Sequence, residues 1–294
     1  MARRANFYKK VRDPNANWLT LDMGNFLSAE SNKQCSPKCN LMLRSYQAMK
    51  YDVLGLSTTE LGLGSEVLTE IRDTLGIPMV CANVLDLKTQ KPVVEPYIIR
   101  RYGNMIIGIT GLLKDDPSTR RLMDTTRLKV MPQVDVARDL IPKLRRKVDA
   151  IILLCDFGNK EVDSLLKVVP QIEVIMTTGS VQPTSQDTRH GKTLLVPAIG
   201  ASGQNGTALT LEFNPAWGDS VGYDLLNIEL AEEYEGENQV SQLVAASKQS
   251  SSAQAEAIKP ATAKEIKLEP SLGASPQAPS PVKSKVSTAP PEGK

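Results

Sequence analysis

The chain has 294 residues, of which 41% are hydrophobic and 23% are charged. This length allows one good-sized hydrophobic core or two small ones. The formal net charge is only +2, from 35 Lys and Arg against 33 Asp and Glu, and aromatic residues make up 4% of the chain. These values argue against a nucleic-acid-binding surface and against attraction to an anionic membrane.

Neither a membrane span nor a signal peptide is predicted. The best apolar run, residues 150–155, has the length of a strand. The N-terminal segment MARRANFYKKVRD is basic, but no apolar core follows it. As given, the chain is therefore expected to be cytoplasmic, and it would be periplasmic or exported if the true start lay upstream.

Strand-like and helix-like segments alternate up to about residue 170. The strand-like segments are 18–23, 52–56, 78–83, 105–111, 149–158 and 173–179, and the helix-like segments are 40–50, 65–76, 133–148 and 159–169. Ser65 is a candidate N-cap for the second helix, which Gly76 and Pro78 end. This βα alternation predicts an α/β domain with a largely parallel sheet.

The pattern changes in the last third of the chain. Residues 193–213 and 223–230 are rich in strand formers without a crossover helix between them, which suggests antiparallel strands that finish a second sheet. From about residue 250 the chain is mostly Ala, Ser, Pro, Lys and Glu, a composition that cannot bury enough apolar surface to fold. We therefore predict a domain over residues 1–238 and a flexible tail over 239–294.

The cysteines and the single histidine give weak signals. Cys81 and Cys155 lie in apolar runs and are predicted to be buried structural thiols. Cys35 and Cys39, in the polar segment CSPKC, could pair or bind a metal, but their spacing is not that of a C-x-x-C motif and no partner pair follows. An ordinary loop pair is the favoured interpretation, and a redox or zinc site stays open. His190 is placed in a polar surface loop.

The ends of four predicted strands together resemble one known superfamily. These segments are LDMGN (21–25), GLSTTEL (55–61), LLCDFGNKEVD (153–163) and VIMTTGSVQPT (174–184). With IPMVCANV, NMIIGITGL and LLVPAIGASGQNG they resemble the metallophosphoesterase (calcineurin-like) superfamily, in its 5′-nucleotidase/UDP-sugar hydrolase branch, over residues 3–230. The resemblance implies a four-layer αββα sandwich that lacks the usual first strand, which would precede Met1.

The resemblance also implies a two-metal site where these loops converge. In such a site two divalent ions (Mn, Zn, Mg or Ca) activate a water and hold the phosphoryl oxygens, and a nearby histidine assists the leaving group. The family's C-terminal domain, which grips the nucleotide, has no counterpart here. The resemblance therefore implies no residues for nucleotide recognition, and no partner is predicted.

The first two metal-site motifs have lost most of their ligands. The family's metal-bridging aspartate falls on Asn25, a neutral residue that bridges two cations poorly. The family's Asn-His pair falls on Thr58 and Thr59. Only the following glutamate is retained, as Glu60, and in the family this residue lies just outside the metal ligands.

The two remaining motifs are also changed. The family's next histidine ligand falls on Asp156, which could still hold a metal. The final His-x-His falls on Gly179 and Val181, neither of which can be a ligand. The sequence therefore predicts a site that would bind metals weakly and not as a pair.

Three functional hypotheses follow. The favoured one is a 5′-nucleotidase-like protein whose catalysis is impaired and which has a binding or scaffold role. The alternative is an active metal-dependent phosphoric-ester hydrolase of nucleotide catabolism, with an altered site built from Asp156, Asn25 and residues upstream of Met1. The third is a thiol/redox or scaffold role for Cys35 and Cys39, which follow the 21–25 segment closely.

Overall fold

The computed structural model describes residues 1–25, 36–179, 189–198, 205–213 and 221–257. Residues Met1–Ala253 form one compact unit. A search of the described helices finds none that is long and apolar enough to cross a membrane.

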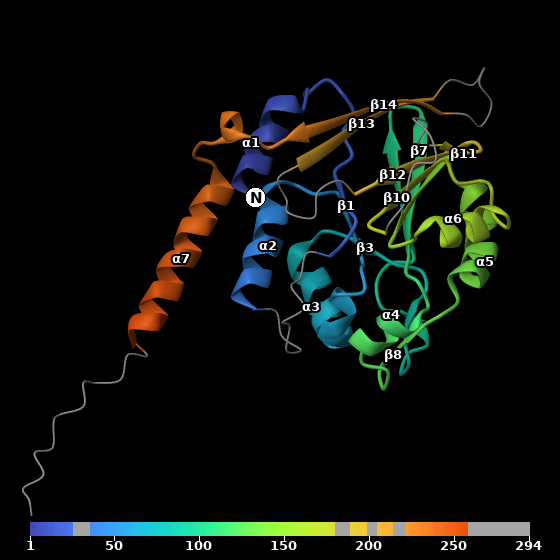
Figure 1. Cartoon of the computed structure of the whole chain (residues 1–294), viewed down its shortest axis with the longest axis horizontal. Helices are drawn as coiled ribbons and strands as arrows, with labels where there is room; N and C mark the ends of the chain where they lie inside the picture. The colour runs from blue at the N-terminus through green and yellow to red at the C-terminus, as the bar shows by residue number, and fades with distance from the viewer. Residues whose placement is uncertain (26–35, 180–188, 199–204, 214–220, 258–294) are drawn as a thin grey trace, which may run out of the picture. The chain divides into compact units, whose positions relative to one another are not determined.

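A six-stranded sheet forms one of the two central layers (Figure 1). Its strands, in spatial order, are β11 (Arg189–His190), β12 (Thr193–Pro197), β10 (Val174–Thr177), β9 (Ala150–Cys155), β7 (Met105–Leu112) and β6 (Tyr97–Tyr102). The four inner strands are parallel, and the two edge strands are antiparallel to their neighbours. The predicted largely parallel sheet is confirmed.

The second central layer consists of two short sheets. One is parallel and contains β1 (Leu21–Asp22), β2 (Val53–Gly55) and β3 (Met79–Val80); the other is the antiparallel pair β13 (Asn205–Phe213) and β14 (Val221–Glu229). Both pack against the six-stranded sheet through one apolar cluster, which includes Val53, Ile109 and Ile152. A third small sheet contains β5 (Lys91–Pro92), β4 (Val84–Asp86) and β8 (Leu128–Val130).

Helices cover the outer face of each central layer. Helices α2 (Pro37–Ala48) and α3 (Gly64–Leu75) share an apolar cluster with the outer residues of β2 and β3, such as Leu54 and Met79. Helices α5 (Gln133–Arg145) and α6 (Asn159–Leu166) pack in the same way on β9. The result is the predicted four-layer αββα sandwich.

Strand β9 shows why its sequence is apolar at every position. Ile152 and Leu154 face the other sheet, whereas Ile151, Leu153 and Cys155 face α5 and α6. A parallel strand buried on both faces has no solvent side and hence no polar alternation. The remaining elements are α1 (Ala2–Val11), the 3₁₀ turns η1 (Glu60–Leu63) and η3 (Glu232–Tyr234), α4 (Pro117–Leu122) and α7 (Gln239–Ala257).

Helix α3 ends as predicted but begins differently. Gly76 adopts the left-handed conformation that terminates a helix, with φ of 63°. The prediction that Ser65 is the N-cap is wrong: η1 leads directly into α3, the N-cap is Leu63, and Ser65 is a buried residue inside the helix.

The end of the chain differs from the prediction in three details. The antiparallel pair β13–β14 is confirmed, but β12 joins the six-stranded sheet in parallel with β10. His190 lies in the short edge strand β11 rather than in a loop, because it pairs with Thr193. Helix α7 begins at the predicted boundary, Val240 is buried in the core, and the compact unit extends to Ala253.

Candidate functional site

The structure brings together residues from the carboxyl ends of several strands. The Thr58 hydroxyl, after β2, donates to an Asp156 carboxylate oxygen after β9 over 3.1 Å. The Thr59 hydroxyl oxygen lies 3.2 Å from the Asn25 side-chain oxygen, after β1. Gly179, after β10, lies against the backbone of Asp156. The predicted positions Val181 and Cys35 lie outside the described residues.

Glu60 organises the turn after β2. Its carboxylate is completely buried. One oxygen accepts hydrogen bonds from the backbone N–H groups of Ser57 (2.9 Å) and Asn25 (3.0 Å) and from the Ser57 hydroxyl, and the other accepts from the Thr59 hydroxyl at 3.0 Å. A buried carboxylate needs such donors, so Glu60 has a structural role in which the hydroxyls of the turn take part.

Asn25 is held in an unusual backbone conformation. Its φ of 62° is left-handed, a region that asparagine tolerates better than most residues. Gly24 before it has φ of 91°, and a Cβ at Gly24 would lie 2.8 Å from the backbone nitrogen of Ser57. The turn after β1 is therefore fixed by close packing against the turn after β2.

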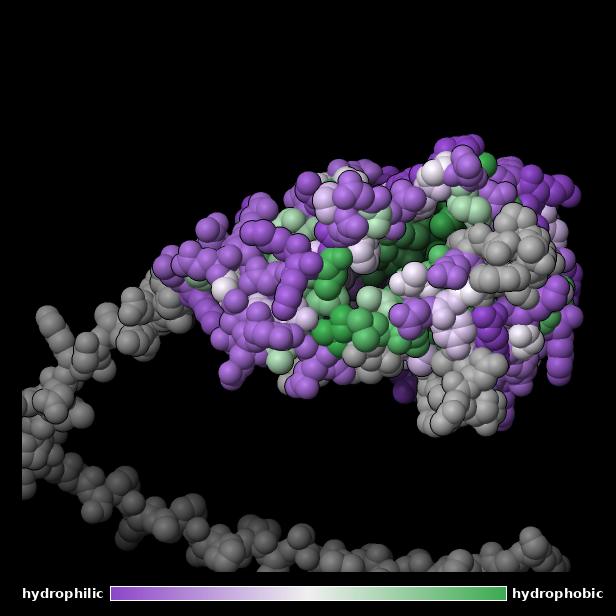
Figure 2. Space-filling view, turned by 90° about the horizontal axis from the view of Figure 1, so that it is seen from above, coloured by the Kyte–Doolittle hydropathy of each residue, from purple (hydrophilic) through white to green (hydrophobic). Residues whose placement is uncertain are grey.

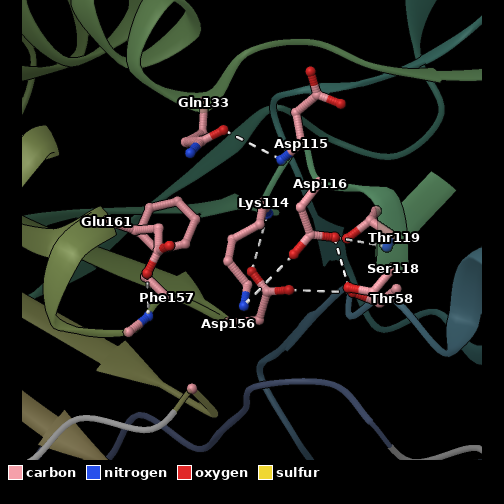
Figure 3. A network of polar contacts seen from close by, with 12 residues as sticks. Thr58, Lys114, Asp115, Asp116, Ser118, Thr119, Gln133, Asp156, Phe157 and Glu161 are labelled. Atoms are coloured by element: carbon pink, nitrogen blue, oxygen red, sulfur yellow. Dashed lines mark hydrogen bonds and ion pairs between the residues drawn. The ribbon is translucent and has the colours of Figure 1, made fainter.

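Asp156 is the one predicted metal position that carries an anionic side chain. Besides the Thr58 hydrogen bond, its second carboxylate oxygen accepts from the backbone N–H of Lys114 over 3.0 Å (Figure 3). Burial raises the pKa of Asp156, and the hydrogen bonds and the positive charge of Lys114 oppose this rise only in part. Both oxygens of the carboxylate thus have protein donors.

The segment Lys114–Asp116, after β7, was missed by the sequence analysis. The Lys114 ammonium lies 3.9 Å from an Asp116 carboxylate oxygen, close to Asp156 (Figure 3). Asp116 also caps α4 by accepting from the backbone N–H of Thr119 at 2.8 Å. The available signal was a Lys-Asp-Asp run directly after a predicted strand, at the sheet edge where polar residues of α/β proteins gather.

Gly179 occupies a position where no side chain fits. A Cβ there would lie 2.2 Å from the Phe157 carbonyl oxygen and 2.6 Å from the Asp156 carbonyl oxygen. The neighbouring hydrogen bonds fix this geometry: the Thr177 hydroxyl donates to the Phe157 carbonyl over 2.7 Å and accepts from the Gly179 N–H over 3.0 Å. A histidine ligand would therefore require a different backbone path.

The donor set does not fit a pair of divalent cations. Among the described residues, no group of three or more His, Cys, Asp or Glu side chains is placed to hold a metal. The carboxylates of Asp156 and Glu60 accept hydrogen bonds from the protein, and a lysine provides the local positive charge. A metal ion would have to displace these donors and lie near an ammonium group.

The other candidate residues lie apart from this arrangement. His190 is on the surface, with its Nδ1 3.5 Å from an Asp163 carboxylate oxygen. Cys81 and Cys155 are buried free thiols, as predicted, and burial raises the pKa of each to about 12. Cys39 is buried in the first turn of α2 and is disulfide-bonded.

Comparison with known proteins gives matches at the level of structure only. No profile of a known protein family and no curated protein sequence matches the chain. Among solved structures, a 5′-nucleotidase precursor from Thermus thermophilus is 20% identical with a TM-score of 0.70, covering 86% of this chain and 53% of its own. The calcineurin-like phosphoesterase YfkN from Bacillus subtilis is 18% identical with a TM-score of 0.68, covering 87% of this chain and 90% of its own.

A third match extends the range of activities found on this fold. The sulfate thiohydrolase SoxB from Thermus thermophilus is 18% identical with a TM-score of 0.70, and the match covers 86% of this chain and 47% of SoxB. The chain thus spans about half the length of two of these three proteins. At such identities a likeness establishes the fold and not the chemistry. The chain therefore has the fold of the calcineurin-like metallophosphoesterases, in the form found in 5′-nucleotidases.

Proposed function

We propose that this chain is a 5′-nucleotidase-like metallophosphoesterase-fold protein that does not hydrolyse phosphoric esters with a metal pair and that has a binding or scaffold role. The observation that carries this proposal is that each oxygen of the Asp156 and Glu60 carboxylates already accepts a hydrogen bond from the protein. Thr58 and the Lys114 N–H occupy the two oxygens of Asp156, and backbone amides and hydroxyls occupy those of Glu60. These hydrogen bonds give both carboxylates polar partners without a metal ion.

The charge balance supports the same proposal. Two divalent cations bring four positive charges, and a site that binds them normally supplies several anionic ligands. Here Asp156 is the one anion at the predicted metal positions among the described residues, and the Lys114 charge already acts on it. Asp116 is engaged with Lys114 and with the N-terminus of α4. Activation of the attacking water is the work of the metal pair in such a site, and on this proposal that step is missing here.

The decisive experiment combines metal analysis with a hydrolysis assay. The full chain would be titrated calorimetrically with Mn²⁺ and with Zn²⁺, and assayed with bis-p-nitrophenyl phosphate, p-nitrophenyl phosphate and AMP, beside Asp156→Ala. We expect no tight binding of two ions and no turnover above that of Asp156→Ala. Metal-dependent turnover that disappears in Asp156→Ala would overturn the proposal in favour of the active phosphoric-ester hydrolase with an altered site.

A further inference from the structure

The second central layer is interrupted between its two short sheets. Among the described strands, β1 pairs only with β2, and β13 and β14 pair only with each other. Yet side chains near β1, such as Leu21 and Met23, pack against the same inter-sheet core as Leu209 and Leu225 from β13 and β14. The two sheets therefore lie in one layer without being joined by hydrogen bonds between strands.

Helix α1 spans this interruption. On one side Phe7 packs against Leu230, which directly follows β14, and meets the Tyr234 ring edge-on at 5.5 Å. On the other side the Arg4 guanidinium lies 3.9 Å from the carboxylate of Asp22 on β1. The helix is thus anchored on both short sheets.

The order of helices and strands along the chain indicates that the interruption next to β1 has room for a strand. Helix α2 connects β1 to its parallel neighbour β2, and α3 connects β2 to its parallel neighbour β3. In this series each helix covers the junction between two adjacent strands. Helix α1 precedes β1 and lies beside it as α2 lies beside β2. No described strand pairs with β1 on the side away from β2.

The inter-sheet core is also incompletely covered. Nine apolar side chains that pack against this core are only partly buried: Leu19, Leu21, Met23, Tyr102, Met176, Leu209, Leu211, Tyr223 and Leu225. Figure 2 shows a hollow lined by apolar residues on the face of the molecule that it displays. An apolar floor with an open sheet edge favours an extended chain, because a strand satisfies backbone hydrogen bonds that a helix or a lipid leaves unmet.

We propose that the interruption between β1 and the β13–β14 pair is a docking site for one extended peptide strand with apolar side chains at alternate positions. The alternate side chains fill the inter-sheet core, and the backbone of the peptide continues the sheet. The partner is therefore a segment of protein in extended conformation, and this site does not depend on the state of the Asp156 region.

Three labelled peptides test this proposal with the full chain. Each has nine residues, the length of β13. The first, KTVTVTVTK, alternates apolar and polar residues; the second, KTTTVVVTK, has the same composition in blocks; the third replaces the central valine of the alternating peptide by proline, which removes a backbone donor. Affinity is measured by fluorescence anisotropy, and hydrogen exchange followed by mass spectrometry locates the protected amides. We expect the alternating peptide to bind at least about tenfold more tightly than the other two, with protection over 19–23 and 205–213.

Variants of the protein give a matched comparison. Leu211→Lys places a charge on the side of β13 that faces the core, whereas Leu226→Lys changes a side chain on β14 that is 55% exposed. The first should weaken binding about tenfold, and the second should leave it unchanged. Failure of the alternating peptide to bind, equal binding of all three peptides, or protection elsewhere would overturn the proposal, and the comparison of peptides stands even if Leu211→Lys does not fold.

Discussion

Replacement of Gly179 by alanine tests the packing that excludes a ligand from the site. The added Cβ would lie 2.2 Å from the Phe157 carbonyl oxygen and 2.4 Å from its carbonyl carbon. Both are backbone atoms held by the Thr177 hydrogen bond, so relief requires a shift of the chain. Overpacking of a rigid site costs about 1–3 kcal/mol. We expect Gly179→Ala to lie in the upper half of that range, at about 2–3 kcal/mol.

Urea unfolding followed by circular dichroism measures this cost. With a slope of about 2 kcal/mol per molar urea, the midpoint should fall by about 1–1.5 M. Gly108→Ala is the matched control: its Cβ would lie 3.1 Å from side-chain atoms of Leu144 and not from backbone, so it should cost less than Gly179→Ala, about 1 kcal/mol. If the free energy of unfolding of Gly179→Ala lay within about 0.5 kcal/mol of that of the parent, the steric argument would be refuted. Gly179→His should likewise fail to raise the affinity for Mn²⁺ or Zn²⁺.

Three further predictions concern titratable groups. Burial raises the pKa of Asp156, so its contribution to stability is complete below the ordinary carboxyl pKa of about 4 and is lost as the pH rises through the raised pKa. Asp156→Asn should therefore gain stability relative to the parent as the pH rises above about 4. Urea midpoints of the two proteins that change in parallel with pH would contradict this. Glu60→Gln should lower the free energy of unfolding by about 1–3 kcal/mol, because the new amide group would face buried donors. The control Glu66→Gln, at an exposed position, should lower it by less than about 0.5 kcal/mol. Equal urea midpoints for the two variants would refute the structural role of Glu60. Burial raises the pKa of Cys81 and of Cys155 to about 12. Both thiols should therefore resist alkylation by iodoacetamide at about pH 8 until urea unfolds the chain. Alkylation of the native protein would contradict this prediction.

The spacing of apolar residues and the positions of glycine and proline made most of the fold predictable. The uninterrupted apolar run over 150–155 corresponds to β9, which is buried on both faces, and Gly76 ends α3. The failures have local physical causes. Ser65 has the chemistry of an N-cap, but the preceding 3₁₀ turn continues directly into the helix and displaces the cap to Leu63. His190 looks like a loop residue because β11 is only two residues long and is defined by its pairing with β12.

The sequence indicated which strand ends lie together but not the contacts between their side chains. The ends of β2, β9 and β10 were identified from sequence motifs, and the structure brings Thr58, Asp156 and Gly179 into one region. Lys114 was missed because no sequence motif links the turn after β7 to Asp156. Such a contact follows from the three-dimensional path of two loops, which a pattern along the chain does not encode.

These contacts show how the described carboxylates can be accommodated without metal ions, as the proposed function requires. When a metal ligand is lost, the remaining carboxylate is a buried charge without a partner, which is costly. Here hydroxyl and amide donors give hydrogen bonds to both Glu60 and Asp156, and the positive charge of Lys114 offsets part of the cost of burying Asp156. Because the compensating groups come from three different loops, restoring one ligand would break hydrogen bonds without recreating a metal pair. On the proposed function, a metal pair would therefore require several substitutions made together, including a new backbone path at Gly179.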